Sequence, residues 1–406
     1  MTEAPAAPRL LDGVRVLDLT NVLAGPFASY QLALLGADVI KVEIPGTGDL
    51  ARRLGADHDL NEAGVGASFL AQNSAKRSLT LNLKSPAGRE VLLRAVKESD
   101  VLVENFRPGV LDRLGLGWDR LREANPGLVY CAISGFGQDG PLRDRPAYDQ
   151  IVQGVSGMMS TTGTEHTGPL RAGYPVADTL GGMTAAFAIA SALVHRDRTG
   201  KGSHLDVSML ESAMTAMGWV VSNHLIAGQD PVPMGNDNFT AAPSGTFATG
   251  DGLLNISANE QRQFVALCEA LDRPDLCADP RFAERSARKT HRTELTEQLE
   301  KALAARTAEQ WEPVLAAAGV PAARVLAVPE ALAQDQVAAR RFVHDLPFPG
   351  GRARPLRVLG SPVHVDGTAP VPAHEPPLLG EHTDTILREL GYDAAAIATL
   401  HEEGTV

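Results

Sequence analysis

The stretch "GVRVLDLTNVLAGPFASYQLALLGADVIKVE", Gly13 to Glu43, decides the fold. It begins with an alternating, β-branched run over 13–20 and continues with a helical apolar period over 25–36, which Gly36 stops. A second strand-like run covers 37–43. This order is typical of a β-α-β unit, in which a crossover helix joins two parallel strands.

The same alternation of strands and helices recurs downstream. We expect a helix over 85–99, with Ser85 as its cap and a proline in its first turn, followed by a strand over 100–106. Another buried strand is expected over 128–137. This spacing predicts an α/β fold class with a Rossmann-like open parallel sheet that carries helices on both faces.

A second domain is expected because 406 residues exceed the size at which a single core stops growing. The alternation of strands and helices ends at about residue 205. Further along the chain, we expect a hairpin with Asp251-Gly252 in its turn, followed by a helix that begins with a Ser257-x-x-Glu260 capping box. We therefore predict a large α/β domain that begins with 1–205, a linker over 206–230, a small α+β domain over 231–328, and a linker with a C-terminal return to the large domain over 329–406.

Bulk composition narrows the class of protein. Apolar residues make up 44% and charged residues 21%, and no run approaches the length of a membrane span. The N-terminus lacks the pattern of a secretory signal, so we expect a cytoplasmic protein without a membrane partner. Three cysteines without C-x-x-C spacing predict neither disulfides nor a metal site. A net charge of -12 disfavours a nucleic-acid partner, while a small anion needs only a local basic surface.

A local basic surface is predicted over 73–113, which holds eight Lys or Arg and five Asp or Glu, and 8 − 5 gives +3. Arginines of the 85–99 helix fit its solvated face. Lys76, Arg77 and Arg107, which lie outside that helix at strand ends, are better candidates for phosphate contacts. No G-x-G-x-x-G or P-loop motif occurs, which disfavours a dinucleotide dehydrogenase or an NTPase.

The stretch "YPVADTLGG", Tyr174 to Gly182, places a carboxylate before a glycine pair that opens an Ala-rich helix. Asp178 has two interpretations: a cap of the 179–196 helix, or the nucleophile of an enzyme. Local sequence alone favours the cap, since Asp is among the commonest helix caps.

Eight segments in the same order carry a resemblance to a known family. The chain resembles the family III CoA-transferases, also called the CaiB/BaiF family, over nearly its whole length. The segments are "VLDLTNVLAGP", "GADVIKVEIPGTGD", "AKRSLTLNLKSPAG", "VLVENFRPGVLDRLG", "AYDQIVQGVSGMMSTTG", "VADTLGGMTAAFAIASAL", "GNDNFTAAPSGTFATGDG" and "PPLLGEHTDTIL".

The resemblance implies that Asp178 is the catalytic aspartate that becomes acylated, and that coenzyme A enters as an acyl-CoA substrate. A carboxylate suits this task because it can attack a thioester and leave again at similar energy. An Asp is ionised at neutral pH, and a helix N-terminus keeps it so. Gly181 and Gly182 would let a pantetheine arm approach and would offer backbone N–H groups to an oxyanion. The resemblance also implies a CoA site at Leu23, Ala24, Leu81 to Lys84, Asn105, Phe106, Arg107 and Arg113, with Ala147, Tyr148 and Asp149 along the channel to the thioester.

Two departures from the formyl-CoA transferase pattern and one missing loop bear on the acceptor. Leu23 and Ile44 stand where that enzyme has a Gln and an Arg, and its Gly-run loop is missing between Gly235 and Gly252. We therefore expect a di- or branched carboxylate such as succinate, mesaconate or itaconate as the acceptor rather than oxalate.

Two other functions stay open at this point. An acyl-CoA racemase of the same family would need a base on each face of the α-carbon, and Tyr148 stands where the racemases carry a His. A non-catalytic CoA-binding protein would predict a changed residue at 178. The resemblance further implies an interlocked homodimer, with which the Pro-rich segment 345–377 is compatible.

Overall fold

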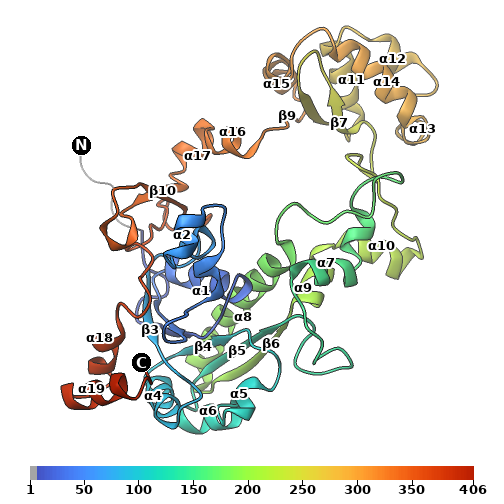
Figure 1. Cartoon of the computed structure of the whole chain (residues 1–406). Coiled ribbons are helices and arrows are strands. Elements are labelled where there is room, and N and C mark those ends of the chain that lie inside the picture. Colours follow the sequence, from blue (N-terminus) through green and yellow to red (C-terminus); the bar gives the residue numbers. More distant parts are fainter. Residues whose placement is uncertain (1–6) are drawn as a thin grey trace. The chain divides into compact units, whose positions relative to one another are not determined.

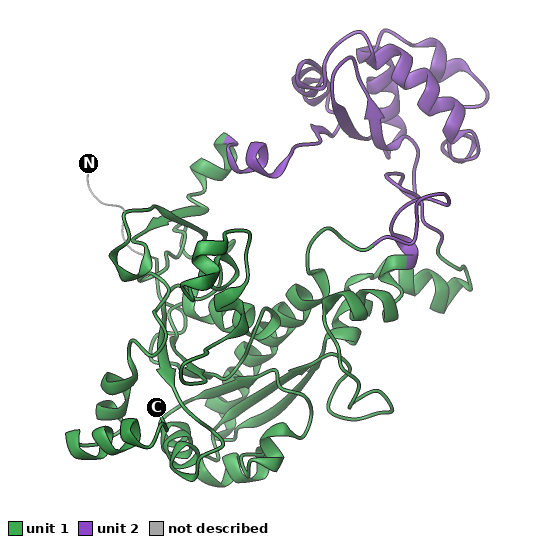
Figure 2. Ribbon diagram, in the orientation of Figure 1, with its two compact units in different colours: residues 1–159, 171–231, 335–406 green, residues 160–170, 232–334 purple. Residues whose placement is uncertain are grey.

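The computed structural model describes residues 7–406; the first six residues, part of the stretch in which we expect no secretory signal, lie outside the described residues. The chain divides into two compact units, coloured separately in Figure 2. Unit 1 comprises 1–159, 171–231 and 335–406, and unit 2 comprises 160–170 and 232–334.

Unit 1 is built on a six-stranded sheet in which every pairing is parallel (Figure 1). The strand order is β3-β2-β1-β4-β5-β6, so the order reverses between β1 and β4. The loops that follow these two strands turn to opposite sides and leave a crevice between them, which is where open α/β sheets bind ligands. The strands are β1 (Arg15–Asp18), β2 (Asp38–Glu43), β3 (Lys76–Thr80), β4 (Val101–Glu104), β5 (Val129–Ser134) and β6 (Ser203–Ser208).

Helices cover both faces of the sheet, as the alternation predicts. One face carries α1, α8 and α9, whose apolar residues join Val16, Val39 and Val101 in one core. The other face carries α4, α6, α18 and α19, which pack with Leu17, Ile40 and Leu102. The Ser85 side chain accepts a hydrogen bond from Gly88 N and so caps α4, as expected. The longer helices of this unit are α1 (Ala24–Leu34), α4 (Pro86–Lys97), α6 (Trp118–Ala124), α7 (Asp149–Val155), α8 (Val176–Thr199), α9 (Met209–Ala216), α10 (Trp219–Ala227), α18 (Thr383–Glu389) and α19 (Ala394–Glu402).

Short elements complete unit 1. They are η1 (Leu50–Arg53), α2 (His58–Glu62), α3 (Ala67–Leu70), α5 (Val110–Arg113), α17 (Asp335–Ala339), η3 (Pro349–Gly351) and the antiparallel pair β10 (Val343–Leu346) and β11 (Leu356–Leu359), while η2 (Met158–Thr161) straddles the boundary. The Pro-rich segment 345–377 therefore contains part of a short hairpin. Residues 206–230, expected to be a linker, form the end of β6 and the helices α9 and α10. The apolar residues Met209 and Ala213 of α9 are buried in the core, whereas α10 has no buried residue.

α8 corrects one expectation drawn from composition. By length and composition alone, this helix could cross a membrane, whereas we expected no run to approach that length. Within unit 1, its buried residues Ala185 and Ile189 join the core that also contains residues of α1 and β5. A core helix passes the same test of length and composition, so the hydropathy of α8 carries little weight for a membrane location.

Unit 2 is a smaller α+β body. Its antiparallel sheet has the order β7-β8-β9, and the hairpin of β7 (Ser244–Ala248) and β8 (Leu253–Ser257) has Gly252 in its turn, as expected. The capping box lies three residues later than expected: Gln263 Oε1 accepts from Glu260 N, while Ser257 ends β8 and its hydroxyl bonds that of Ser244 at 3.1 Å. The other elements are α11 (Gln261–Ala270), α12 (Asp275–Ala278), α13 (Arg285–Thr290), α14 (Arg292–Leu303), α15 (Ala308–Ala317), β9 (Ala322–Arg324) and α16 (Val328–Leu332).

Candidate active site at the switch point of the sheet

A pocket of about 300 Å³ lies at the carboxyl end of the sheet, where the strand order reverses. Its walls come from the loops after β1, β4 and β5 and from the first turn of α8. The volume is that of a small-ligand site. The lining residues are Asn21 to Ala24, Leu50, Asn105 to Pro108, Ile133 to Gly135, Arg143, Arg145 to Tyr148, Asp178 and Met209.

Asp178 lies in the first turn of α8, and its carboxylate is not the cap of that helix. The N-cap residue is Pro175, which has no side chain able to accept a hydrogen bond. The free N–H groups are taken by Asp149 of α7, whose Oδ1 accepts from Ala177 N at 2.8 Å and from Asp178 N at 3.3 Å. A carboxylate from another helix therefore caps α8, so the cap interpretation of Asp178 is wrong and its side chain is left to face the pocket.

The electrostatic surroundings of Asp178 differ from our expectation. Burial first, and the neighbouring carboxylate of Asp149 second, raise the pKa of Asp178 to about 7. We expected the helix N-terminus to keep Asp178 ionised. That expectation is corrected, because the loss of water and the like charge of Asp149 outweigh the favourable helix dipole.

Asp149 itself lies below the pocket surface. It is 7% exposed, and Gln153 Nε2 donates to its Oδ2 at 2.6 Å. Its side chain holds the backbone of the Asp178 turn, and Asp149 is not among the residues that line the pocket. The implied place of Asp149 along the thioester channel stays a prediction.

The glycine pair brings helices together. A β-carbon on Gly181 would meet Met209 Cγ at 2.8 Å, and one on Gly182 would approach the backbone oxygen of Ala24 at 2.5 Å. Protein atoms thus lie where a β-carbon on either glycine would point, and the expected approach of a pantetheine arm and of an oxyanion to the pair stays a prediction. Ala24 and Met209 both line the pocket. The two glycines therefore set how closely α8 approaches these two walls of the pocket.

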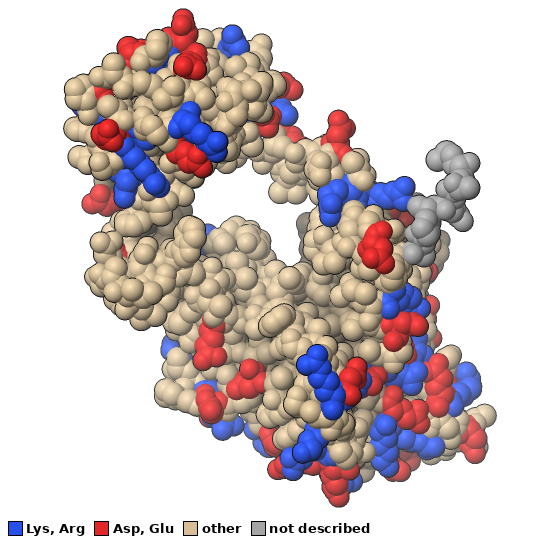
Figure 3. All heavy atoms as spheres, turned by 180° about the vertical axis from the view of Figure 1, so that it is seen from behind, with Lys and Arg blue, Asp and Glu red and all other residues tan. Residues whose placement is uncertain are grey.

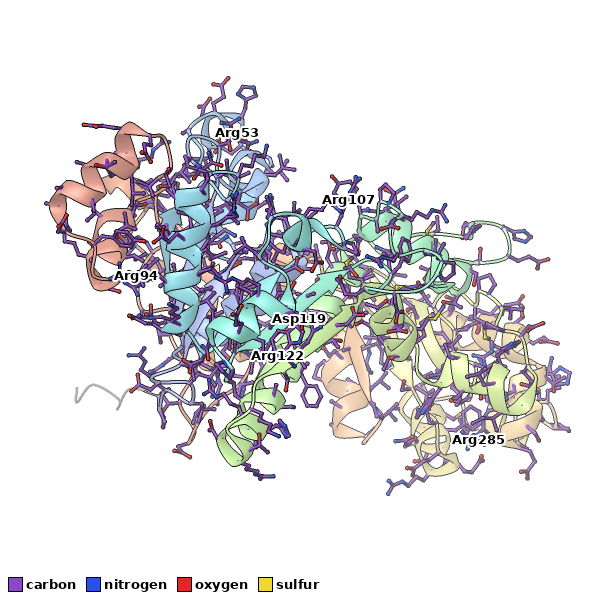
Figure 4. All side chains as sticks on the ribbon, turned by 90° about the horizontal axis from the view of Figure 1, so that it is seen from below. Arg53, Arg94, Arg107, Asp119, Arg122 and Arg285 are labelled. Atoms are coloured by element: carbon purple, nitrogen blue, oxygen red, sulfur yellow. The ribbon has the colours of Figure 1, made fainter. Side chains whose placement is uncertain are left out.

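Three arginines give the pocket its positive charge. Arg107, labelled in Figure 4, follows β4 in the "ENFRPG" loop, as expected. Arg143 and Arg145 come from the loop after β5 and were missed by the sequence analysis. The signal was the run "RDRPAYD", Arg143 to Asp149, which contains Tyr148 and lies outside the basic window at 73–113. All three arginines are exposed and so can meet an anionic ligand.

Lys76 and Arg77 are not brought to this pocket. Lys76 is fully buried, and its Nζ donates to Asp18 Oδ2 at 3.0 Å. Arg77 pairs with Asp38 and Glu389. Both residues belong to β3, and each meets a protein carboxylate, so neither adds to the charge of this pocket.

The other candidates divide between the pocket and its surroundings. Leu81 is buried in the core under α4, while Lys84 and Arg113 do not line the pocket. Their implied contacts with CoA stay predictions. The candidates that the structure does bring together in the pocket are Leu23, Ala24, Asn105, Phe106, Arg107, Ala147, Tyr148 and Asp178.

Within residues 7–406, no three His, Cys, Asp or Glu side chains are grouped so that they could hold a metal ion. Cys131 and Cys268 are both buried, and burial raises the pKa of each thiol, so neither has the character of a nucleophile.

Comparisons with known proteins agree with this geometry. A family model described as CoA-transferase family III matches residues 11–383. An acetyl-CoA:oxalate CoA-transferase of Acetobacter aceti is 41% identical over 370 residues, which cover 90% of this chain and 92% of the relative. A succinyl-CoA:glutarate CoA-transferase of Homo sapiens is 35% identical over 397 residues, 98% of this chain and 90% of the relative. The crystal structure of a CaiB/BaiF family protein from Brucella suis matches with a TM-score of 0.83 at 36% identity, covering 95% of this chain and 100% of that one.

Proposed function

The chain belongs to CoA-transferase family III and is an enzyme of the CoA-transferase type, and on that premise we propose that it moves CoA from an acyl-CoA to a small dicarboxylic acid through Asp178. One observation carries the proposal: the Asp178 carboxylate, relieved of capping by Asp149, faces a pocket at the switch point with three arginines around it. The arginines suit the phosphates of a CoA nucleotide, and Asp178 suits the thioester.

Asp178 would act in four balanced steps. Its carboxylate attacks the donor thioester, which forms a mixed anhydride and releases CoA thiolate. The thiolate then attacks the Asp178 carbonyl, giving an aspartyl-CoA thioester and the free donor acid. The acceptor carboxylate displaces the thiolate again to form a second anhydride. The thiolate finally attacks the acceptor carbonyl, which yields the new acyl-CoA and regenerates the Asp178 carboxylate.

The raised pKa of Asp178 supports this role. Its charge is disfavoured by burial and by Asp149. Acylation removes that charge, so the same surroundings that disfavour the free carboxylate favour the covalent intermediates. A carboxylate with a pKa near 7 is also a stronger nucleophile than an ordinary Asp.

Dicarboxylates are the proposed acceptors because relatives are named for oxalate, for glutarate and for mesaconate. Oxalate belongs in the test beside the acceptors that we expect, since the oxalate-named relative is 41% identical. The enzyme is incubated with acetyl-CoA or succinyl-CoA and each of succinate, glutarate, mesaconate, itaconate and oxalate, and thioesters are separated by chromatography and identified by mass spectrometry. A new acyl-CoA formed with at least one acceptor supports the proposal. Release of free CoA alone, with every acceptor, contradicts it.

We further propose a cytoplasmic, interlocked homodimer. Several apolar side chains of α8 and α10 are exposed, Trp219 by 78% and Ile226 by 85%, and Phe187 is 75% exposed. Figure 3 shows that the surface over α10 carries few Lys, Arg, Asp or Glu side chains. Such a surface is typical of one that another protein covers. Light scattering after size-exclusion chromatography tests the state: twice the chain mass is expected, and a monomer at micromolar concentration contradicts it.

A further inference from the structure

Val22 adopts a backbone conformation that valine rarely takes. Its φ is +70°, in the left-handed region, where a β-branched side chain meets its own backbone. Val22 lies in the loop after β1 and lines the pocket next to Asn21, Leu23 and Ala24. A strained residue persists only where its surroundings hold it, and such residues gather at functional sites. The contacts that hold Val22 in this conformation are therefore candidates for a functional role.

Asp49 holds the backbone of Val22 from inside the protein. The Oδ1 atom of Asp49 accepts from Val22 N at 3.0 Å and from Ala51 N at 2.8 Å. Its other oxygen, Oδ2, forms an ion pair with Lys41 Nζ at 2.9 Å. The two side chains are 0% and 1% exposed, so a charge on either one depends on the other.

Lys41 ties the same loop to the sheet at a second point. Its Nζ donates to Thr20 O at 3.0 Å, and Lys41 lies in β2, directly beside Asp18 of β1. Between these two anchors, Asn21 exchanges hydrogen bonds with Asn105: Asn21 N donates to Asn105 Oδ1, and Asn105 Nδ2 donates to Asn21 O, both at 2.8 Å. Three consecutive residues of the loop, from Thr20 to Val22, are thus fixed.

A glycine would take this conformation without strain, so the fold alone does not call for valine here. Val22 lines the pocket, and the hydrogen bond from Val22 N to Asp49 Oδ1 holds it in place. We propose that Asp49, paired with Lys41, is a positioning residue that holds strained Val22 and so preorganises the 21–24 loop for acyl-CoA. This inference rests on the proposed function, because it takes CoA as the ligand of the pocket.

Two double variants separate the hydrogen bond from the charge. Asp49→Asn/Lys41→Met removes both charges and keeps an acceptor for Val22 N, whereas Asp49→Ala/Lys41→Met removes both charges and the acceptor. We expect the first variant to bind CoA within about threefold of the wild type and the second to bind about tenfold more weakly. Adding Val22→Gly to the second variant should recover most of the loss, since glycine reaches the left-handed conformation without help.

Isothermal titration with free CoA gives the dissociation constants, and steady-state kinetics gives KM and kcat for the donor acyl-CoA. In Asp49→Ala/Lys41→Met, KM for the donor acyl-CoA should rise, while kcat should stay within about threefold of the wild type because Asp178 is unchanged. Equal affinities for the Asn and Ala variants would overturn the inference alone. A wild type that binds no CoA would overturn the proposed function with it.

A second measurement covers the case in which Asp49→Ala/Lys41→Met does not fold. Val22→Gly in the otherwise unchanged protein should raise the melting temperature, because it relieves the strain at this position. A lower melting temperature for Val22→Gly than for the wild type would show that Val22 is not strained, and would contradict the inference.

Discussion

Replacing Asp178 by Asn should stabilise the folded protein while it abolishes transfer. The folded protein holds this carboxyl with a pKa of about 7 instead of the ordinary 3.8, through burial first and Asp149 second. The folded state therefore binds the proton more tightly than the unfolded chain. Stability from this group is fully present below about pH 3.8 and is lost as the pH rises towards 7. Asn is a permanently neutral stand-in of the same shape.

The magnitude follows from the pKa difference. At 1.36 kcal/mol per pKa unit, ionising Asp178 in the folded protein costs at most about 4 kcal/mol above pH 7. Water that enters the pocket screens part of this cost, so we expect about 2 kcal/mol. For a body of this size, that corresponds to a rise in melting temperature of about 4 °C at pH 8. At pH 5 Asp178 is ionised in the unfolded chain but protonated in the folded protein, so only part of the 3.8-to-7 interval has been crossed. About a third of the rise in melting temperature should therefore remain at this pH.

The assay is thermal unfolding of wild type and Asp178→Asn at pH 8 and pH 5, at one fixed protein concentration because a dimer would melt according to its concentration. Asp119→Asn is a matched control: Asp119 also lies in the first turn of a helix, and its side chain is 95% exposed (Figure 4). This control should lose a little stability, since it removes a charge that favours the helix N-terminus. Equal melting temperatures of wild type and Asp178→Asn at pH 8 would refute the electrostatic account of the site.

Three further outcomes are expected. The kcat/KM for donor acyl-CoA should rise with pH through about pH 7 as Asp178 ionises, and Asp149→Asn, which keeps an acceptor for Ala177 N but loses the charge, should move the midpoint to lower pH by about one unit; an unmoved midpoint would speak against the influence of Asp149. Arg107→Ala and Arg145→Ala should each raise KM for acyl-CoA by about tenfold at low salt with kcat little changed, whereas Arg122→Ala, outside the pocket, should not. A 2-methylacyl-CoA kept with the enzyme in D₂O without an acceptor acid should gain no deuterium at the α-carbon by mass spectrometry, and its uptake would favour a racemase.

The parallel sheet could be predicted from local sequence because β-branched runs and helical periods alternate over 13–43 and again over 85–134. The strand order could not. It depends on which strands pair over long separations, such as Val16 of β1 with Val101 of β4, and no local pattern encodes this choice. The switch point between β1 and β4, which places the pocket, therefore comes from the structure.

The candidate site was predictable in part. Asp178 stood out, but its local sequence could not separate a cap from a nucleophile, because the cap comes from Asp149, 29 residues away. The charge count over 73–113 treated Lys76 as free, although Asp18, 58 residues away, neutralises it inside the protein. Arg143 and Arg145 lie in a loop whose course no periodicity describes. Side-chain partners over such separations are fixed by tertiary packing.

Trapping the acyl group on the enzyme tests the central claim most directly. Wild-type enzyme is incubated with the donor acyl-CoA that proves active, without an acceptor, then treated with hydroxylamine or borohydride, digested and examined by mass spectrometry. The account predicts a modification on the peptide that carries Asp178, at that side chain, and neither modification nor CoA transfer with Asp178→Ala. A trapped group on any other residue, or full transfer activity in Asp178→Ala, would contradict it.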